Sequence, residues 1–124
     1  MSINHTIAWV DIPVLNLDRA IAFYSKILGV PVQKISENAF EFGLLPHEDE
    51  NVSGCLCVIP DRKPSQEGLL VYLNVEGRLT EAVEAARAMG QKILAEKAQI
   101  GPYGHRAVIL DTEGNAIALY SKAA

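Results

Sequence analysis

The sequence predicts an α+β fold built from two tandem βαβββ modules. The chain has 124 residues and a mass of 13.5 kDa, which is the size of one compact domain. Its apolar patterns give the order strand, helix and three strands, and this order occurs twice. Both predicted helices end at a glycine, and these two glycines, Gly29 and Gly90, are 61 residues apart. We expect one domain over residues 1–124, with module one at about 5–60, a linker at about 61–68 and module two at about 69–122.

The first half begins with a strand and a helix. Residues 7–12 are rich in β-forming side chains and end at Pro13, which favours a strand. Asn16 is a typical helix N-cap, and Gly29 supplies a left-handed stop. Between them the apolar residues follow helical spacing: Leu17, Ala20, Ile21, Tyr24, Ile27 and Leu28.

Three further strands are expected in the first half, at residues 30–35, 39–45 and 54–59. The segment 46–53 contains His47, Glu48, Asp49 and Glu50 and is predicted to be a solvated loop. Residues 62–68 contain proline, serine and glycine and are expected to link the halves.

The second half repeats this order. Residues 69–75 predict a strand, and Gly90 ends a helix whose apolar face is Leu79, Ala82, Val83, Ala86 and Met89. Strands are expected at 91–95, within 98–110 and at 116–120, with a tight turn at 112–115.

The halves align at an offset of 61. This offset pairs Val14 with Val75, Leu28 with Met89, and Val58 with Leu119. A shared order of elements at a fixed spacing is what a duplicated supersecondary unit leaves behind.

Charge and hydropathy exclude two classes of partner. The net charge of −4 and pI of about 5.3 have the wrong sign for a protein that neutralises nucleic-acid phosphates or anionic lipid. The longest apolar runs, at 55–59 and 69–73, are far shorter than the ~20 residues of a membrane helix. The sequence begins without a signal-peptide pattern, so we expect a cytoplasmic protein that binds neither nucleic acid nor membrane.

Cysteine and histidine spacing gives no metal motif. Cys55 and Cys57 form a C-x-C pair with no second ligand pair to complete a zinc site, so we expect reduced, buried thiols acting as small apolar side chains. His5, His47 and His105 are scattered along the chain. We expect neither a metal nor a cofactor.

The order of elements and two motifs resemble the vicinal oxygen chelate superfamily, which includes glyoxalase I, extradiol dioxygenases and the bleomycin- and fosfomycin-resistance proteins. The motifs are Asp18-Arg-Ala-Ile-Ala-Phe-Tyr24, with Leu28-Gly-Val30 after it, and Leu110-Asp-Thr-Glu-Gly-Asn115. The resemblance implies two modules whose sheets curl into a shared, ligand-binding cup, and a homodimer in which the partner often completes the cup.

The resemblance also implies where a metal would sit. Glyoxalase-like members hold a divalent ion with one side chain from the first and last strand of each module, positions that correspond here to Trp9, Cys57, Leu70 and Ala118. Three of these side chains offer no metal-binding atom, which argues against glyoxalase and dioxygenase chemistry.

Strand alternation through these positions predicts the inward face of the cup. The expected ligand-binding residues are Trp9, Asp11, Cys57, Leu70, Tyr72, Ala118 and Tyr120, joined by Tyr103 and His105 from the glycine-rich turn at 101–105. Ile7, Cys55, Ile59 and Ala116 are expected on the same face.

Asp11 is the candidate catalytic residue. The offset places it opposite Tyr72, and a carboxylate facing an apolar cup is suited to act as a general base or to bind a cation. The alternative is a structural role, in which Asp11 accepts backbone hydrogen bonds or pairs with Arg62 or Arg106.

Three functions remain open at this point. The first is a metal-independent small-molecule-binding protein of the bleomycin-resistance type. The second is a glyoxalase-related lyase or isomerase that uses Asp11 as base, assisted by Tyr72 or His105. The third is a dimeric interaction domain whose cup is filled by Trp9.

Overall fold

The structure is a computed structural model that describes residues 6–37, 39–48 and 51–124. The order of its helices and strands is the one that the sequence predicts. The strands form two four-stranded sheets, with strand orders β1-β4-β3-β2 and β5-β8-β7-β6. The first sheet and helix α1 make up module one, which consists of β1 (Trp9–Pro13), α1 (Leu17–Leu28), β2 (Gln33–Glu37), β3 (Phe40–Leu44) and β4 (Ser53–Cys57). Module two consists of β5 (Val71–Asn74), α2 (Leu79–Ala88), β6 (Ile93–Gln99), the short 3-10 helix η1 (Gly101–Tyr103), β7 (His105–Leu110) and β8 (Ala116–Ser121).

Helix α1 begins and ends where the sequence predicts. The side chain of Asn16 accepts a hydrogen bond from the Arg19 N–H at 3.0 Å, and Gly29 ends the helix with a φ of 76°. Its apolar face is buried through Ala20, Phe23, Tyr24 and Ile27. The helix therefore contributes much of the core that lies between the modules.

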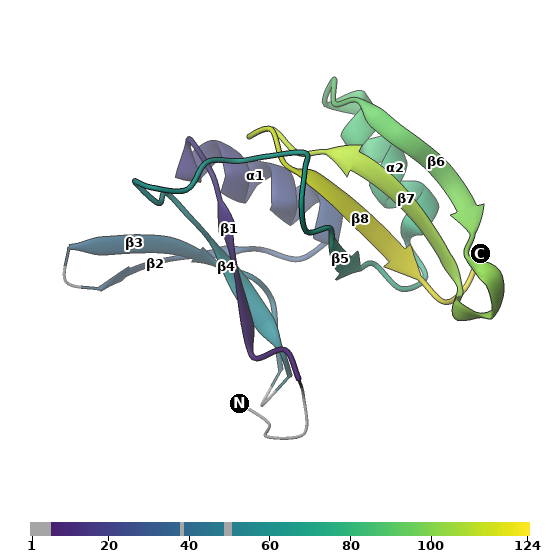
Figure 1. Ribbon diagram of the computed structural model, residues 1–124, viewed down its shortest axis with the longest axis horizontal. Coiled ribbons are helices and arrows are strands. Elements are labelled where there is room, and N and C mark those ends of the chain that lie inside the picture. The colour runs from purple at the N-terminus through teal and green to yellow at the C-terminus, as the bar shows by residue number, and fades with distance from the viewer. Residues whose placement is uncertain (1–5, 38, 49–50) are drawn as a thin grey trace.

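The two helices pack against each other, and α2 also covers β6, β7 and β8. Figure 1 shows α1 between the two sheets, with the β2–β3 hairpin extending away from module two. The Arg78 guanidinium, at the start of α2, donates to the carbonyl oxygen of Ile27 at 3.1 Å. This contact ties the end of one helix to the beginning of the other.

The fold class expected from the sequence, α+β with two βαβββ modules, is confirmed, and the two four-stranded sheets are separate and not closed on one another. In each sheet the first strand, β1 or β5, is an edge strand paired only with the last strand of its module. Module one and module two are held together by helix packing and by the turn before β8, not by a continuous ladder of strands.

The two resemblance motifs contact each other in the core. The Tyr24 hydroxyl donates to Asp111 Oδ2 at 2.6 Å, and Arg19 Nε donates to Glu113 Oε2 at 2.7 Å. Asn115 Nδ2 also donates to the Pro13 carbonyl at 2.8 Å. The helix of module one is therefore anchored to the last turn of module two.

The observed strand registers show that the offset of 61 between the two modules is not constant. The Val14 N–H donates to the Cys57 carbonyl and the Val75 N–H donates to the Tyr120 carbonyl, so the first strands keep the offset of 61 while the last strands are 63 apart. The pairing of Val58 with Leu119 is therefore wrong, and Ala118 corresponds to Cys55. Two extra residues lie between Gly90 and β8, a region in which the β6–β7 pairing has register shifts.

The strand bounds differ most at β6, which continues to Gln99 although residues 91–95 were expected. Its sequence ILAEKAQ has little alternation, and six of its seven residues are exposed, so burial gives no pattern that marks its end. Among the described residues, no helix is both long and apolar enough to span a membrane.

Candidate functional site

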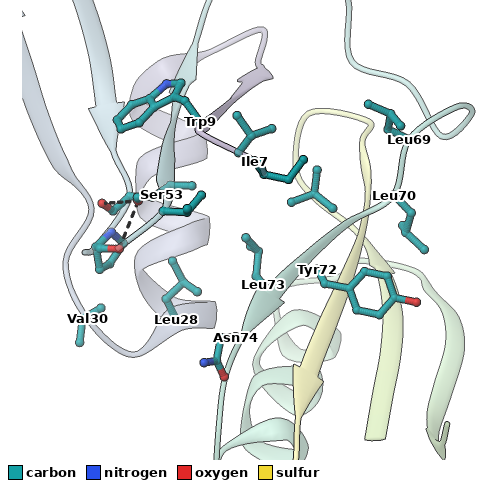
Figure 2. A pocket seen from close by; sticks show the side chains of 15 residues that line it. Ile7, Trp9, Leu28, Val30, Ser53, Leu69, Leu70, Tyr72, Leu73 and Asn74 are labelled. Atoms are coloured by element: carbon teal, nitrogen blue, oxygen red, sulfur yellow. Dashed lines mark hydrogen bonds between the residues drawn. The ribbon is translucent and has the colours of Figure 1, made fainter. Parts of the chain in front are cut away.

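A cavity of about 630 Å³ lies between the modules. Module one lines it with residues that include Ile7, Trp9, Leu28 and Val30, and module two lines it with residues 69–74. Figure 2 shows Trp9 and Tyr72 on opposite sides, with Ile7 and Leu73 between them. We call this space the intermodule cavity.

The intermodule cavity is apolar. No residue that lines it, within the part of the chain that the structure describes, is a histidine, cysteine, aspartate or glutamate. The Ser53 side chain points to the segment that follows β3, because its hydroxyl donates to the carbonyls of Leu45 and Pro46 at 3.1 and 3.3 Å (Figure 2). The polar groups that remain for a ligand belong chiefly to Tyr72 and Asn74.

Tyr72, on β5, contacts the Arg106 side chain, which comes from β7 of the same sheet. The Arg106 guanidinium donates to the Tyr72 hydroxyl, and its Cζ lies 5.8 Å from the centre of the Tyr72 ring. Arg106 thus fixes one wall of the cavity and places a positive charge at its margin.

A second hollow, of about 440 Å³, lies on the face of the module one sheet. We call it the thiol hollow; it is lined by Trp9, Asp11, Phe40, Phe42, Cys55, Cys57, Val58, Ile59, Pro60 and Arg62. Among these lining residues, Asp11 is the one carboxylate and Arg62 is the one cation. Trp9, Asp11, Cys55, Cys57 and Ile59, which strand alternation predicts on one face, all line this hollow.

Asp11, Cys55 and Cys57 form a compact cluster in the thiol hollow. Cys55 Sγ lies 3.4 Å from Asp11 Oδ1 and 3.9 Å from Cys57 Sγ, and one ligand atom from each of the three lies within 4.8 Å of the others. Trp9 Nε1 donates to the same Oδ1 at 3.0 Å and holds the carboxylate in place. Asp11 faces Cys55 directly in the parallel β1–β4 pairing, which explains this contact.

Both thiols are protonated at neutral pH. Burial, the neighbouring Cys57 and the hydrogen bond to Asp11 raise the pKa of Cys55 to about 12. Burial also raises the pKa of Cys57. Neither thiol is therefore activated as a nucleophile, because nucleophilic cysteines have a lowered pKa.

The structure distributes the expected ligand-binding residues over separate places. Trp9, Leu70 and Tyr72 line the intermodule cavity, whereas Asp11 and Cys57 lie in the thiol hollow. Asp11 and Tyr72 are not brought together, since the partners of Asp11 are Trp9 and Cys55 and the partner of Tyr72 is Arg106.

The remaining expected residues lie in module two. Tyr103 is exposed in η1, and its carbonyl accepts a hydrogen bond from the Tyr120 hydroxyl. His105 begins β7, and its buried Nδ1 has no hydrogen-bond partner in the described structure. Ala118 is fully buried in β8, and none of these four residues lines either space described above. His5, Asp49 and Glu50 lie outside the described residues.

Sequence reasoning missed the aromatic pair that lines the thiol hollow and the cation that contacts Tyr72. Phe40 and Phe42 form an aromatic pair over the thiol hollow, with ring centres 5.5 Å apart. Their spacing of two on a predicted strand was a signal that could have placed them on one face. Arg106 beside Tyr72 had no such signal, because it depends on which strands pair.

The positions at which the family resemblance implies a metal do not suit one. Trp9, Leu70 and Ala118 carry no metal-binding atom, and the corrected register makes Cys55 rather than Cys57 the counterpart of Ala118. One thiol in four positions cannot hold a divalent ion in the expected way.

The sequence model of the glyoxalase/bleomycin resistance protein/dioxygenase superfamily matches residues 3–119. Among solved structures, that of UcmS2 is 25% identical, with a TM-score of 0.66, and the match covers 95% of this chain and 98% of that one. A glyoxalase/bleomycin resistance protein/dioxygenase family enzyme from Burkholderia phytofirmans PsJN is 17% identical, with a TM-score of 0.67 and coverage of 92% and 96%.

A glyoxalase/bleomycin resistance protein from Streptomyces sp. CB03234 is 19% identical, with a TM-score of 0.64, and the match covers 93% of this chain and 99% of that one. No curated protein matches the chain in sequence.

Proposed function

The chain belongs to the glyoxalase/bleomycin resistance protein/dioxygenase superfamily, and from this premise we propose that it is a metal-independent small-molecule-binding protein. Its ligand would be an apolar or aromatic compound of drug size. The observation that carries this proposal is the intermodule cavity, whose volume of about 630 Å³ and apolar wall are typical of small-molecule sites.

Metal independence is supported by the chemistry of the cavity wall. A divalent ion needs imidazole, thiolate or carboxylate ligands, and the described residues that line the cavity supply none of them. Binding would instead come from apolar burial and from the ring faces of Trp9 and Tyr72.

The fluorescence of Trp9 provides the test, because it is the only tryptophan of the chain. We expect an apolar fluorescent probe such as anilinonaphthalene sulfonate to bind saturably and to receive energy from Trp9. The change Leu70→Gln should weaken binding about tenfold, since it removes roughly 1.5 kcal/mol of apolar contact.

Leu94→Gln is the matched control for Leu70→Gln. The two leucines are 37% and 39% exposed, but Leu94 lies on β6, and it does not line the cavity. Equal weakening in both variants, or no saturable binding to the wild type, would contradict the proposal.

A second candidate function, a lyase or isomerase with Asp11 as base, is favoured by one observation. Asp11 is exposed and is the one carboxylate among the residues that line the thiol hollow. A base of this kind would exchange the α-protons of carbonyl compounds in deuterium oxide, as mass spectrometry detects. Asp11→Asn should abolish the exchange while Asp18→Asn retains it, and unchanged exchange in Asp11→Asn would dismiss the assignment.

We also propose that the protein acts in the cytoplasm as a homodimer, without nucleic acid as a partner. The net charge of −4 disfavours phosphate-rich partners. Eleven large apolar side chains are exposed among the described residues, and a homodimer interface would cover those that lie together, such as Phe40 and Val58 beside the thiol hollow.

A further inference from the structure

We propose that Asp11, Cys55 and Cys57 form a binding site for one thiophilic divalent cation of the Zn²⁺ or Cd²⁺ class. This site is separate from the intermodule cavity. Of the four positions at which the family resemblance implies a metal, it uses only the one on β4, which is Cys57, or Cys55 in the corrected register, and it takes no ligand from module two. The three residues come from two adjacent parallel strands, so the backbone of the sheet holds them together.

The spacing of the ligand atoms fits tetrahedral coordination. Bond lengths of about 2.3 Å to sulfur and 2.0 Å to oxygen place two sulfurs about 3.8 Å apart and a sulfur and an oxygen about 3.5 Å apart. The corresponding distances are 3.9 Å between the two sulfurs and 3.4 Å between Cys55 Sγ and Asp11 Oδ1. The third pair, Cys57 Sγ and a carboxylate oxygen of Asp11, lies within 4.8 Å and has to approach to about 3.5 Å when the cation binds.

The surroundings also suit a cation. The Trp9 Nε1 hydrogen bond orients the Asp11 carboxylate, as partners of metal ligands commonly do. The cluster faces the thiol hollow, which leaves a fourth position open to water or to an added thiol. Two sulfur ligands select for thiophilic ions over Mg²⁺ and Ca²⁺, which prefer oxygen.

Binding must displace the thiol protons. The cation replaces the protons of Cys55 and Cys57, which leave to solvent, and two metal–thiolate bonds form without oxidation or reduction. Because both cysteines bind a cation as thiolates and their protons must leave, affinity should increase with pH. The expected increase approaches a hundredfold per pH unit below both pKa values, since two protons are released.

Titration with Cd²⁺ tests the site. We expect one ion per chain by native mass spectrometry, with a mass gain equal to cadmium minus two protons, and the ultraviolet absorption of thiolate-to-cadmium charge transfer. Cys55→Ser and Cys57→Ser should each weaken binding by roughly tenfold or more and reduce this absorption. Circular dichroism identifies any variant that has lost its fold.

Asp11→Asn and Asp18→Asn are the matched pair, because both aspartates are exposed and substitution of either disturbs no core packing. The first should weaken Cd²⁺ binding by roughly tenfold, and the second should leave it unchanged. The proposal is overturned if the wild type shows no charge-transfer absorption, or if folded Cys55→Ser and Cys57→Ser both retain full affinity.

Discussion

Glu113, in the last turn of module two, is a buried polar residue that joins the two modules. It is 4% exposed, and its carboxylate accepts hydrogen bonds from the backbone N–H groups of Leu15 and Asn16, both at 2.8 Å. The Arg19 guanidinium donates to both carboxylate oxygens, at 2.7 and 3.0 Å. A buried carboxylate with this many donors is stabilised in its charged form.

The stability of the fold should therefore fall in acid. Burial alone would raise the pKa of Glu113, but the hydrogen bonds from Arg19, Asn16, Thr112 and Leu15 outweigh it and lower the pKa to about 2. Because this value lies below the ordinary 4.5, the stabilisation is complete above pH 4.5 and is lost as the pH falls toward 2. We expect urea unfolding to show a loss of roughly 3 kcal/mol over this window.

Glu113→Gln should remove most of that acid-dependent loss and lower the free energy of unfolding by roughly 2 kcal/mol at neutral pH. Glu67→Gln is the control, because Glu67 is an exposed carboxylate. If both variants keep the wild-type pH profile, the Glu113 carboxylate does not stabilise the fold through its charge.

At the scale of elements, the two helix stops provide a matched comparison. Gly29 and Gly90 both have a left-handed φ, 76° and 82°, so alanine at either position should cost about 1 kcal/mol. A Cβ at Gly90 would meet nothing within 4 Å, whereas a Cβ at Gly29 would lie 2.7 Å from the Arg78 guanidinium. The contact of Arg78 with the end of α1 therefore distinguishes the Gly29 site from the Gly90 site.

Gly29→Ala should therefore destabilise the protein more than Gly90→Ala. Arg78 is flexible enough to move aside, but it then loses its hydrogen bond to the Ile27 carbonyl, which adds about 1 kcal/mol. Thermal unfolding of the two variants measures the difference. Equal losses in the two variants would show that the Arg78 contact contributes nothing to stability.

The local elements were predictable because short-range signals specify them. The Asn16 cap, the Gly29 stop and the apolar spacing between them predicted helix α1 with its observed bounds. The end of β6 was not predictable, since an exposed edge strand has no burial pattern. The change of offset from 61 to 63 was also hidden, because strand register depends on pairing across the sheet rather than on neighbours in sequence.

Part of the candidate site was predictable, because strand alternation is also a short-range signal. Strand alternation placed Trp9, Asp11, Cys55 and Cys57 on one face, and they do line one hollow. The expected meeting of Asp11 with Tyr72 assumed that the two sheets form one cup, and the sheets do not close. How two modules are placed relative to each other depends on helix packing and on the buried Glu113 contacts, which no local pattern reveals.

At the scale of the whole molecule, the open arrangement leaves much apolar surface uncovered. Phe40 and Val58, which line the thiol hollow, are 53% and 52% exposed, and β2 and β6 are edge strands that pair along one side only. Exposed strand edges and aromatic side chains are features that proteins usually cover. A second copy of the chain is the simplest cover, since most soluble oligomers are symmetric homodimers.

Light scattering should therefore give a mass of twice 13.5 kDa at micromolar concentration. Phe40→Gln should shift the protein toward the single-chain mass, because it replaces an exposed aromatic ring that a partner would bury. Leu15→Gln is the control: Leu15 is 63% exposed but lies in the turn between β1 and α1, away from the sheet face. A single-chain mass for the wild type would refute the dimer, and equal dissociation in both variants would place the interface elsewhere than on the face of Phe40.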